Sequence, residues 1–195
     1  MSLINLYNNG QYYKCSDKNT VHSYVEGYYT HEFKNPERVE RILEIGIWTG
    51  GSMLLWSDWF PNAQVIGFDN NPHAIDQAEK TRKKWYKDND YSRVLMRLRD
   101  AYTLDTVARV EDDSCDYIID DGPHTLDSMK YAIKHYLKKV KPGGKLIIED
   151  VQSISWFDEL EDVSEEVKDL VKECKRVVLD TDYRYDDLIF EITRK

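Results

Sequence analysis

Short apolar runs alternate with longer stretches of helical spacing along most of this chain. Five of these runs have the length of buried strands: residues 41–45, 64–68, 93–98, 115–120 and 145–149. Two more, Arg176–Leu179 and Leu188–Ile192, are joined by a link short enough for a hairpin, so we expect them to be antiparallel. The pattern predicts an α/β fold, with a doubly wound, mostly parallel seven-stranded sheet and an antiparallel C-terminal hairpin.

Helices are expected between these strands. Asn71 followed by Pro72 is typical of an N-cap with proline at the first helical position, and this helix is expected to run to about Tyr86. Apolar residues between Leu126 and Val140 recur on one stripe, which predicts another helix. The remaining expected helices span Ser52–Phe60, 104–110 and Val163–Lys175, and the last of them would bury Cys174.

The N-terminal residues do not follow this alternation. Aromatic residues are frequent between Tyr7 and Phe33, ahead of the first predicted strand. We therefore predict two parts, an aromatic-rich arm or lid at residues 1–36 and one domain over residues 37–195.

Composition and charge narrow the classes of partner. With 41% hydrophobic and 32% charged residues, the chain is typical of a soluble globular protein, and no apolar run is long enough to span a membrane. A net charge of −9 disfavours nucleic acid, whose binding relies on neutralising phosphates. The three cysteines are far apart and no secretory signal is indicated, so we expect reduced thiols in a cytoplasmic protein. A homo-oligomer is left open.

The stretch most informative about ligands is the glycine turn at residues 43–51, Leu-Glu-Ile-Gly-Ile-Trp-Thr-Gly-Gly. It lies between a strand and a helix, and Asp69 ends the next strand, as in doubly wound folds that hold adenosine-containing ligands. Dinucleotides need a glycine where this chain has Trp48, because the backbone must approach the pyrophosphate there. S-adenosylmethionine (SAM) has no phosphates. The turn therefore favours SAM, with a nicotinamide or flavin dinucleotide as the alternative.

Acidic residues end all five predicted parallel strands. Asp69 would accept hydrogen bonds from both ribose hydroxyls, and Asp100, with Ala101 and Tyr102, would bind the adenine amino group. A single acid at a strand end is often only a turn former, but five of five are hard to ascribe to turns. The other candidates on the cofactor side, at the glycine turn and the fourth strand end, are Glu44, Gly46, Gly50 and Asp120.

A second group of acids indicates a metal. Asp121, Glu149 and Asp150 lie where two adjacent strands end, and three gathered carboxylates repel one another unless a positive charge neutralises them. Mg²⁺ prefers such oxygen ligands. Adjacent strand residues face opposite ways, so Glu149 and Asp150 can both be ligands only where the strand breaks up. The alternative is a set of solvated turn acids without a metal.

His124 follows Asp121 in the sequence Asp-Asp-Gly-Pro-His, at the start of a predicted helix. A histidine beside a metal-bound hydroxyl is a suitable general base, so Asp121 and His124 are the candidate catalytic residues. The alternative for His124 is an exposed histidine at a helix start.

Several motifs together resemble a known family. They are Ser16-Asp-Lys, His22-Ser-Tyr, Tyr28-Tyr, residues 43–56, residues 61–69, Ile119-Asp-Asp-Gly-Pro-His and residues 142–150. The chain is similar to class I SAM-dependent methyltransferases with a Rossmann-like fold. Within them it resembles the metal-dependent macrolide sugar O-methyltransferases (mycinamicin 2''-O-methyltransferase type) over about residues 16–155.

The resemblance implies that Asp121, Glu149 and Asp150 bind Mg²⁺, that His124 is the base, and that the arm around Lys18 closes over the cofactor. Two departures limit it. Pro123 stands where the family usually has serine, and the chain lacks the large additional N-terminal domain of the macrolide enzymes.

The sequence as a whole favours Mg²⁺-assisted O-methylation of a small-molecule hydroxyl, in a glycoside or polyol, with SAM as methyl donor. The alternatives are a metal-independent methyltransferase that acts on nitrogen or on a macromolecule, and a non-catalytic SAM-binding module.

Overall fold

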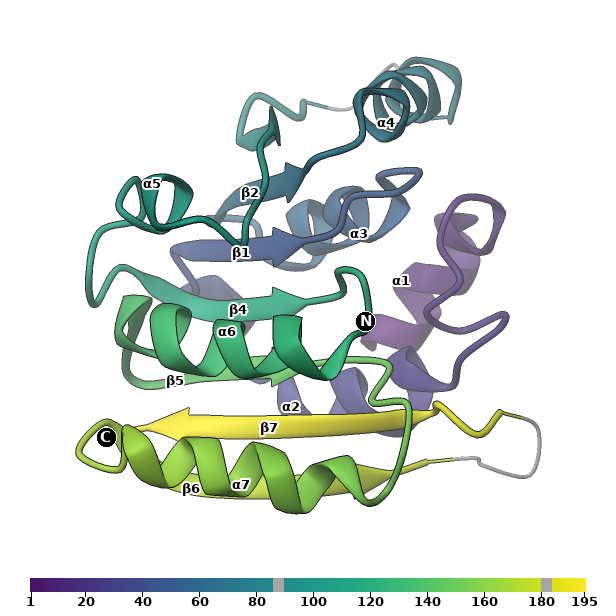
Figure 1. The fold of residues 1–195 in the computed structure, drawn as a ribbon. Helices are drawn as coiled ribbons and strands as arrows, with labels where there is room; N and C mark the ends of the chain where they lie inside the picture. Colours follow the sequence, from purple (N-terminus) through teal and green to yellow (C-terminus); the bar gives the residue numbers. More distant parts are fainter. Residues whose placement is uncertain (86–89, 180–183) are drawn as a thin grey trace.

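The computed structural model describes residues 1–85, 90–179 and 184–195, and its centre is a seven-stranded sheet (Figure 1). The strand order is β3-β2-β1-β4-β5-β7-β6. The first five strands run parallel, and β7 is antiparallel to both of its neighbours. The strands are β1 (Arg41–Ile45), β2 (Gln64–Asp69), β3 (Val94–Leu98), β4 (Cys115–Asp120), β5 (Val140–Ile148), β6 (Val171–Val178) and β7 (Leu188–Arg194). The predicted fold class is confirmed.

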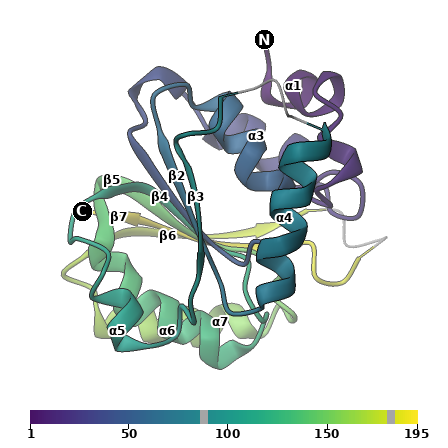
Figure 2. The ribbon, with the colours of Figure 1, turned by 90° about the horizontal axis from the view of Figure 1, so that it is seen from above.

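Helices cover both faces of the sheet (Figure 2). One face carries α3 (Gly51–Trp59) and α4 (Pro72–Trp85), and the other carries α5 (Leu104–Val107), α6 (Leu126–Tyr136) and α7 (Trp156–Glu166). Successive strand residues point to opposite faces, so Ile42 packs in one core and Leu43 in the other. Both faces of the central strands are therefore buried, as the near-continuous apolar runs predict.

The expected start of the second helix is confirmed, because Asn71 accepts a hydrogen bond from the backbone N–H of His73 at 3.0 Å and the helix begins at Pro72. The expected end at Tyr86 lies outside the described residues. The helix predicted from Leu126 to Val140 is shorter, since α6 gives way to a 3₁₀ turn, η4 (Leu137–Lys139).

Several boundaries in the second half of the chain were predicted wrongly. The expected helix Val163–Lys175 is α7, which ends at Glu166, followed by β6 from Val171. Cys174 therefore lies on a strand opposite Ile192, and it is only partly buried. Strand β5 starts at Val140, earlier than the predicted residue 145.

The N-terminal arm packs as part of the protein core. It contains α1 (Leu3–Asn9), η1 (Tyr12–Lys14), the π-helical turn η2 (Val25–Tyr29), α2 (Thr30–Glu32) and η3 (Pro36–Arg38). The rings of Tyr29 and Phe33 lie 4.9 and 5.2 Å from that of Trp56 in α3. Figure 1 shows α1 beyond the carboxyl ends of β1 and β4, whereas α2 lies behind β5 and β7. Whether it moves as a lid stays a prediction.

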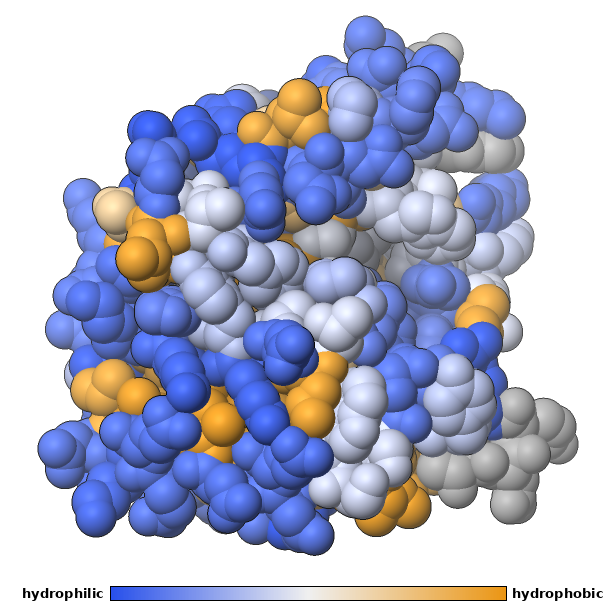
Figure 3. Space-filling model, viewed as in Figure 1, coloured by the Kyte–Doolittle hydropathy of each residue, from blue (hydrophilic) through white to orange (hydrophobic). Residues whose placement is uncertain are grey.

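The outer face over α5, α6 and α7 is mostly polar, with small separate apolar areas (Figure 3). Among the residues that the structure describes, no helix combines the length and the apolar character needed to cross a membrane.

Candidate functional site

A cavity opens where the order of the sheet reverses. The chain passes from β1 outward to β2 and β3, and then returns to place β4 on the other side of β1. Ligands of doubly wound folds bind at this switch point, outside the carboxyl ends of the strands. The cavity has a volume of about 460 Å³, which suits a small molecule. Its walls come from the loops after β1, β2, β3, β4 and β5 and from Asp17 of the arm.

Gly46 shapes the inner wall of the cavity. Its φ of +91° is unfavourable for other residues, and a Cβ atom there would lie 1.9 Å from the backbone oxygen of Asp121. Gly46 lines the cavity as predicted. Gly50 does not line it, since its missing Cβ makes room for Ala78 of α4 instead. Trp48 is 60% exposed and lies on the cavity wall.

Asp69 lines the cavity, but its carboxylate also holds the glycine turn. One oxygen accepts the backbone N–H groups of Ile47 at 2.9 Å and Trp48 at 3.2 Å, and the other accepts that of Asn71 at 2.8 Å. A carboxylate has about four acceptor positions, so roughly one remains for a ribose hydroxyl rather than the two expected. Asn70 and Asn71, which also line the cavity, are the nearest additional polar groups in sequence.

Asp100, Ala101 and Tyr102 line the cavity as one turn after β3. Asp100 is exposed and accepts the backbone N–H of Tyr102 at 2.9 Å. Asp120 does not line the cavity, because it is buried beneath Tyr102, whose hydroxyl donates a hydrogen bond to it. Burial raises the pKa of Asp120 to about 7.

At the other end of the cavity, Asp121, His124 and Asp150 come together. The His124 Nδ1 atom lies 3.4 Å from an Asp150 oxygen, and its Nε2 atom lies 4.0 Å from an Asp121 oxygen. One possible ligand atom of each residue lies within 4.8 Å of the others, the only such group among the described residues. Both His124 and Asp150 have positive φ, at 52° and 53°, a conformation that costs a non-glycine residue about 1–3 kcal/mol. The strained turns aim both side chains into the cavity.

The structure does not bring Glu149 into this group. Strand β5 ends at Ile148, and beyond it Glu149 and Asp150 point different ways. Glu149 is 0% exposed and bonds to Lys18 and to the Tyr29 hydroxyl of the arm. Of the predicted ligand set, Asp121 and Asp150 therefore line the cavity while Glu149 does not, and binding of Mg²⁺ by the three acids stays a prediction. The regular alternation of side-chain directions ends after Ile148, as expected. The change of direction separates the side chains of Glu149 and Asp150 and does not bring them together.

Lys18 places one positive charge among the carboxylates. Its ammonium contacts Asp121 at 2.9 Å, Glu44 at 3.4 Å and Glu149. Burial alone would lower the pKa of Lys18, but Asp121, Glu149 and Glu44 raise it well above its usual value. Burial raises the pKa of Glu44 to about 7 even beside Lys18. Glu44 does not line the cavity, so its predicted contact with a ligand is not seen.

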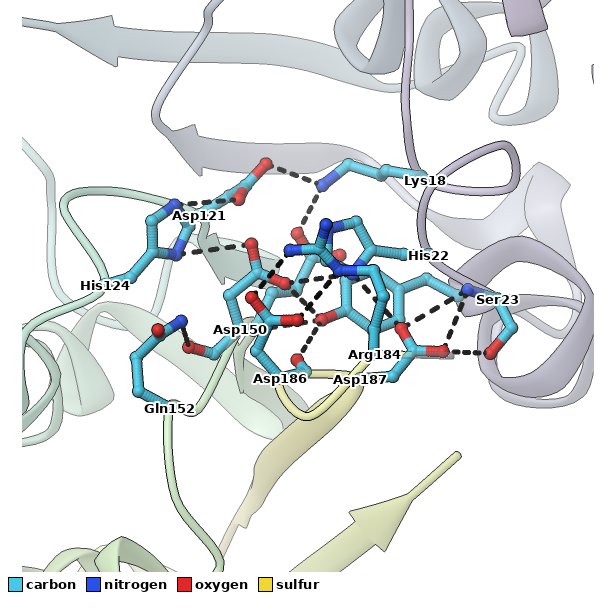
Figure 4. A network of polar contacts seen from close by, with 12 residues as sticks. Lys18, His22, Ser23, Asp121, His124, Asp150, Gln152, Arg184, Asp186 and Asp187 are labelled. Atoms are coloured by element: carbon cyan, nitrogen blue, oxygen red, sulfur yellow. Dashed lines mark hydrogen bonds and ion pairs between the residues drawn. The ribbon is translucent and has the colours of Figure 1, made fainter. Parts of the chain in front are cut away.

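Two residues of the arm contact the carboxylate of Asp150. The hydroxyl of Tyr24 donates a hydrogen bond to its Oδ1, and His22 Nδ1 lies 3.3 Å from the same oxygen and 3.1 Å from Asp187. Figure 4 shows this network, with Asp150 between His124 on one side and His22 on the other. Burial raises the pKa of Asp150.

Sequence reasoning missed the arm residues that hold these acids. The hydroxyls of Tyr24 and Tyr29 and the ammonium of Lys18 reach carboxylates more than a hundred positions away in sequence. The signals were the aromatic content of an arm that precedes the first strand and the motifs Ser16-Asp-Lys, His22-Ser-Tyr and Tyr28-Tyr that match the family, but neither says which acids these residues contact.

Residues 43–151, more than half of the chain, match the family described as a methyltransferase domain. Mycinamicin VI 2''-O-methyltransferase of Micromonospora griseorubida is 29% identical over 125 residues, which cover 60% of this chain and 28% of that protein. The 8-demethyl-8-alpha-L-rhamnosyl tetracenomycin-C 2'-O-methyltransferase of Streptomyces olivaceus is 27% identical over 148 residues, which cover 72% of this chain and 36% of that protein. The chain spans about a third of the length of these curated relatives.

A similar fold occurs in MycE, a methyltransferase from the mycinamycin biosynthetic pathway, solved in complex with Mg and SAH. The two structures agree with a TM-score of 0.71 at 20% sequence identity, over 100% of this chain and 55% of that one.

Proposed function

The chain belongs to the methyltransferase domain family, and from this premise we propose that it transfers the methyl group of SAM to a hydroxyl of a small glycoside or polyol. One observation carries the proposal. A single cavity joins a turn typical of adenosine-binding sites, at Asp69 and Asp100, to an acid–histidine group at Asp121, His124 and Asp150. The residues proposed to bind the donor and those proposed to act on the acceptor therefore lie on the walls of one cavity.

The adenosine end fits SAM by the chemistry of its donors and acceptors. Asp69 keeps about one acceptor position for a ribose hydroxyl, and the exposed Asp100 carboxylate is free to accept from the adenine amino group. Gly46 lets the glycine turn approach the Asp121 backbone, and this turn forms the part of the cavity wall proposed for the methionine end. Trp48 occupies the position at which a dinucleotide site needs a glycine, which supports SAM over NAD.

The other end fits a hard divalent cation, because oxygens of Asp121 and Asp150 lie within 4.8 Å of each other, with the His124 imidazole beside them. Such an ion, when bound, supplies Lewis-acid chemistry that lowers the pKa of an acceptor hydroxyl. Asp121 and Asp150 would hold the ion. His124 would take the proton of the acceptor hydroxyl as its oxygen bonds to the methyl carbon of SAM, while the C–S bond breaks and S-adenosylhomocysteine leaves. The cavity walls align the two reactants, which is the main contribution expected for a methyl transfer.

The acceptor class rests on the relatives, whose names describe methylation of sugar hydroxyls in antibiotic biosynthesis. An acidic chain with a net charge of −9 suits a neutral small molecule better than a polyanion.

The test is transfer of a labelled methyl group from SAM to a panel of glycosides, with and without a chelator. The proposal expects transfer to at least one sugar hydroxyl, with most of it lost in excess chelator. Absence of transfer to any hydroxyl acceptor, with SAM bound, would point to a non-catalytic SAM-binding module.

A second candidate is a metal-independent methyltransferase of the same fold. It is favoured by Lys18, because an ammonium already neutralises the carboxylates that suggested a metal. Transfer that is equally fast in excess chelator would select this candidate.

A further inference from the structure

The loop that carries His124 is short and lies between two parts of the proposed donor site. It consists of residues 121–124, which directly follow β4 and all line the cavity. On one side it meets the glycine turn after β1, where the Asp121 backbone N–H donates to the Ile45 oxygen at 2.8 Å and the missing Cβ of Gly46 allows the close approach. The position of His124 therefore depends on what holds this loop on its other side.

On that other side the contact is the hydroxyl of Tyr102. It donates a hydrogen bond to the carboxylate of Asp120, which is only 3% exposed. Among the described residues, no second side chain donates a hydrogen bond to Asp120. The same hydroxyl lies against Gly122, since a Cβ atom there would be 2.0 Å from the hydroxyl oxygen. Tyr102 therefore contacts the loop twice, by a hydrogen bond to the residue before it and by packing against its second residue.

Tyr102 is itself held by its own turn and by α6. Its backbone N–H donates to the Asp100 carboxylate at 2.9 Å, and its ring meets that of Tyr131 edge-on, with centroids 5.9 Å apart. The preceding Ala101 carbonyl accepts a hydrogen bond from the Tyr136 hydroxyl at 2.6 Å. Tyr131 and Tyr136 both belong to α6. The turn after β3 is therefore anchored on α6, and Tyr102 cannot follow a movement of the loop without breaking these contacts.

Pro123 links the Tyr102 contact to the proposed base. It is the only residue between Gly122 and His124, and its ring fixes its φ angle. A displacement of Gly122 is therefore passed on to His124 with little freedom to absorb it. His124 also has a φ of 52°, a strained conformation that persists only where the surrounding structure holds it.

We propose that the Tyr102 hydroxyl is a positioning group for His124. It holds Asp120 and Gly122 so that the imidazole points into the cavity, while the turn that carries Tyr102 binds the adenosine of the donor. The inference rests on the proposed function, because it concerns the base of that reaction. It gives Tyr102 a role in the chemical step in addition to its place on the cavity wall. The hydroxyl acts through the loop and needs no contact with the acceptor.

Tyr102→Phe tests the proposal, because it removes the hydroxyl and keeps the ring. Misplacing a catalytic group can cost about a hundredfold in rate, so kcat per SAM-binding site should fall by roughly ten- to a hundredfold. SAM affinity should stay within about threefold of the parent, because the aromatic wall of the cavity remains. Methyl-transfer kinetics and calorimetry on the same preparation measure the two values. A loss of unfolding free energy with kcat close to that of the parent would show a purely structural role and overturns the proposal.

Gly122→Ala tests the packing contact from the other partner. Gly122 does not have a positive φ, so the added methyl group acts through its overlap with the Tyr102 hydroxyl, and kcat should fall by about tenfold or more. In Gly122→Ala/Tyr102→Phe the overlapping oxygen is gone, and the nearest ring atom lies 3.1 Å from the Cβ position. The double variant should therefore be no slower than the slower single variant. Independent sites would multiply their losses, and a multiplied loss overturns the proposed contact.

The matched control is Tyr131→Phe. The Tyr131 hydroxyl is also buried, and its ring packs against Tyr102, but it has no hydrogen-bond partner among the described residues and does not line the cavity. Its removal should leave kcat and SAM affinity unchanged. Equal losses of kcat in Tyr131→Phe and Tyr102→Phe would show that packing of the pair controls the rate, and not the bond to Asp120, which overturns the proposal.

A readout without turnover separates this inference from the proposed function. The ¹H–¹³C NMR signal of the His124 ring, identified by its absence in His124→Ala, should shift or broaden in Tyr102→Phe and stay unchanged in Tyr131→Phe. The exposed ring of His31 in α2 serves as an internal reference. An unchanged His124 signal in Tyr102→Phe overturns the inference. Absence of methyl transfer by the parent contradicts the proposed function alone, since the NMR comparison needs no acceptor.

Discussion

At the scale of single residues, His124 is the side chain on which the proposed reaction depends most. General-base catalysis is typically worth ~10²–10⁴-fold, so His124→Ala should lower kcat by about that factor. SAM affinity should change little, because Asp69 and Asp100, the residues proposed to contact the adenosine, lie at the other end of the cavity. Steady-state kinetics of methyl transfer, with calorimetry of SAM binding, measure the two effects separately.

His135→Ala is the control for this experiment. His135 belongs to α6, which begins two residues after His124, but it packs against Tyr131 with ring centroids 4.2 Å apart and does not line the cavity. Its replacement should leave kcat unchanged. If His124→Ala keeps a rate within a few-fold of the parent, another group accepts the proton.

Gly46 gives a second residue-scale prediction, on stability. Gly46 and Gly143 both have positive φ, at +91° and +81°, but an added Cβ meets the Asp121 backbone only at Gly46. Gly143→Ala should cost about 1–2 kcal/mol of unfolding free energy from backbone strain alone. Gly46→Ala should cost roughly 1–3 kcal/mol more, because the turn must also shift. Denaturant unfolding compares the two, and equal losses would show that the close approach does not matter.

Part of the site follows from sequence because parallel strands end at one edge. That geometry predicts that Asp121, His124 and Asp150 meet, and that Asp69 and Asp100 flank the same cavity. It does not say which way a residue turns once the strand has ended. The direction of Glu149 depends on Lys18 and Tyr29, which no local pattern connects to β5.

At the scale of secondary-structure elements, the N-terminus of α6 positions His124. Thr125 is the N-cap, and its side chain and that of Ser128 form a reciprocal capping box. Thr125→Ala should cost about 1 kcal/mol of unfolding free energy. Because His124 directly precedes the cap, the variant should also lower kcat. Chemical denaturation and kinetics of the same preparation measure both.

Ser155→Ala is the matched control, since Ser155 is the N-cap of α7 but makes no capping hydrogen bond. Its stability should change by less than about 0.5 kcal/mol. Equal losses in the two variants would contradict the importance given to the capping box.

The buried strands were predicted correctly because continuous apolar runs mark them in the sequence. The start of α4 was predicted correctly from the Asn71-Pro72 pair. The end of α7 was missed because Val163, Val167, Leu170 and Val171 continue a helical spacing across a turn into β6. A register shift between Val171 and Glu173 also interrupts the alternation typical of a strand. The start of β5 was missed because its pairing with β4 shifts between Cys115 and Tyr117, around the Pro142–Gly144 segment.

At the scale of the whole molecule, the arm joins the two ends of the chain through buried tyrosines. Burial raises the pKa of Tyr7 from 10.0 to about 12, and burial also raises the pKa of Tyr12 and Tyr28. A tyrosine whose pKa is higher in the folded state contributes stability that is complete below the unfolded pKa. That stability is lost as the pH rises through the folded pKa. The protein should therefore lose stability progressively above about pH 10.

Denaturant unfolding as a function of pH measures this loss. Between about pH 10 and 12, the unfolding free energy of Tyr7→Phe should fall less steeply with pH than that of the parent. The difference in slope should be at most about 1.4 kcal/mol per pH unit, the value for one titrating proton. Identical slopes in the parent and the variant would show that Tyr7 does not contribute to alkaline unfolding.

The central claim is that the cavity at the switch point between β1 and β4 binds SAM. Calorimetric titration of SAM and, separately, of NAD into the chain tests it most directly. The account predicts that SAM binds and that Asp69→Ala weakens it by about 1.5–3 kcal/mol. The exposed acid Asp105, which is paired with Arg109 outside the cavity, serves as the control, and Asp105→Ala should not change the affinity. Binding of NAD without binding of SAM would contradict the account.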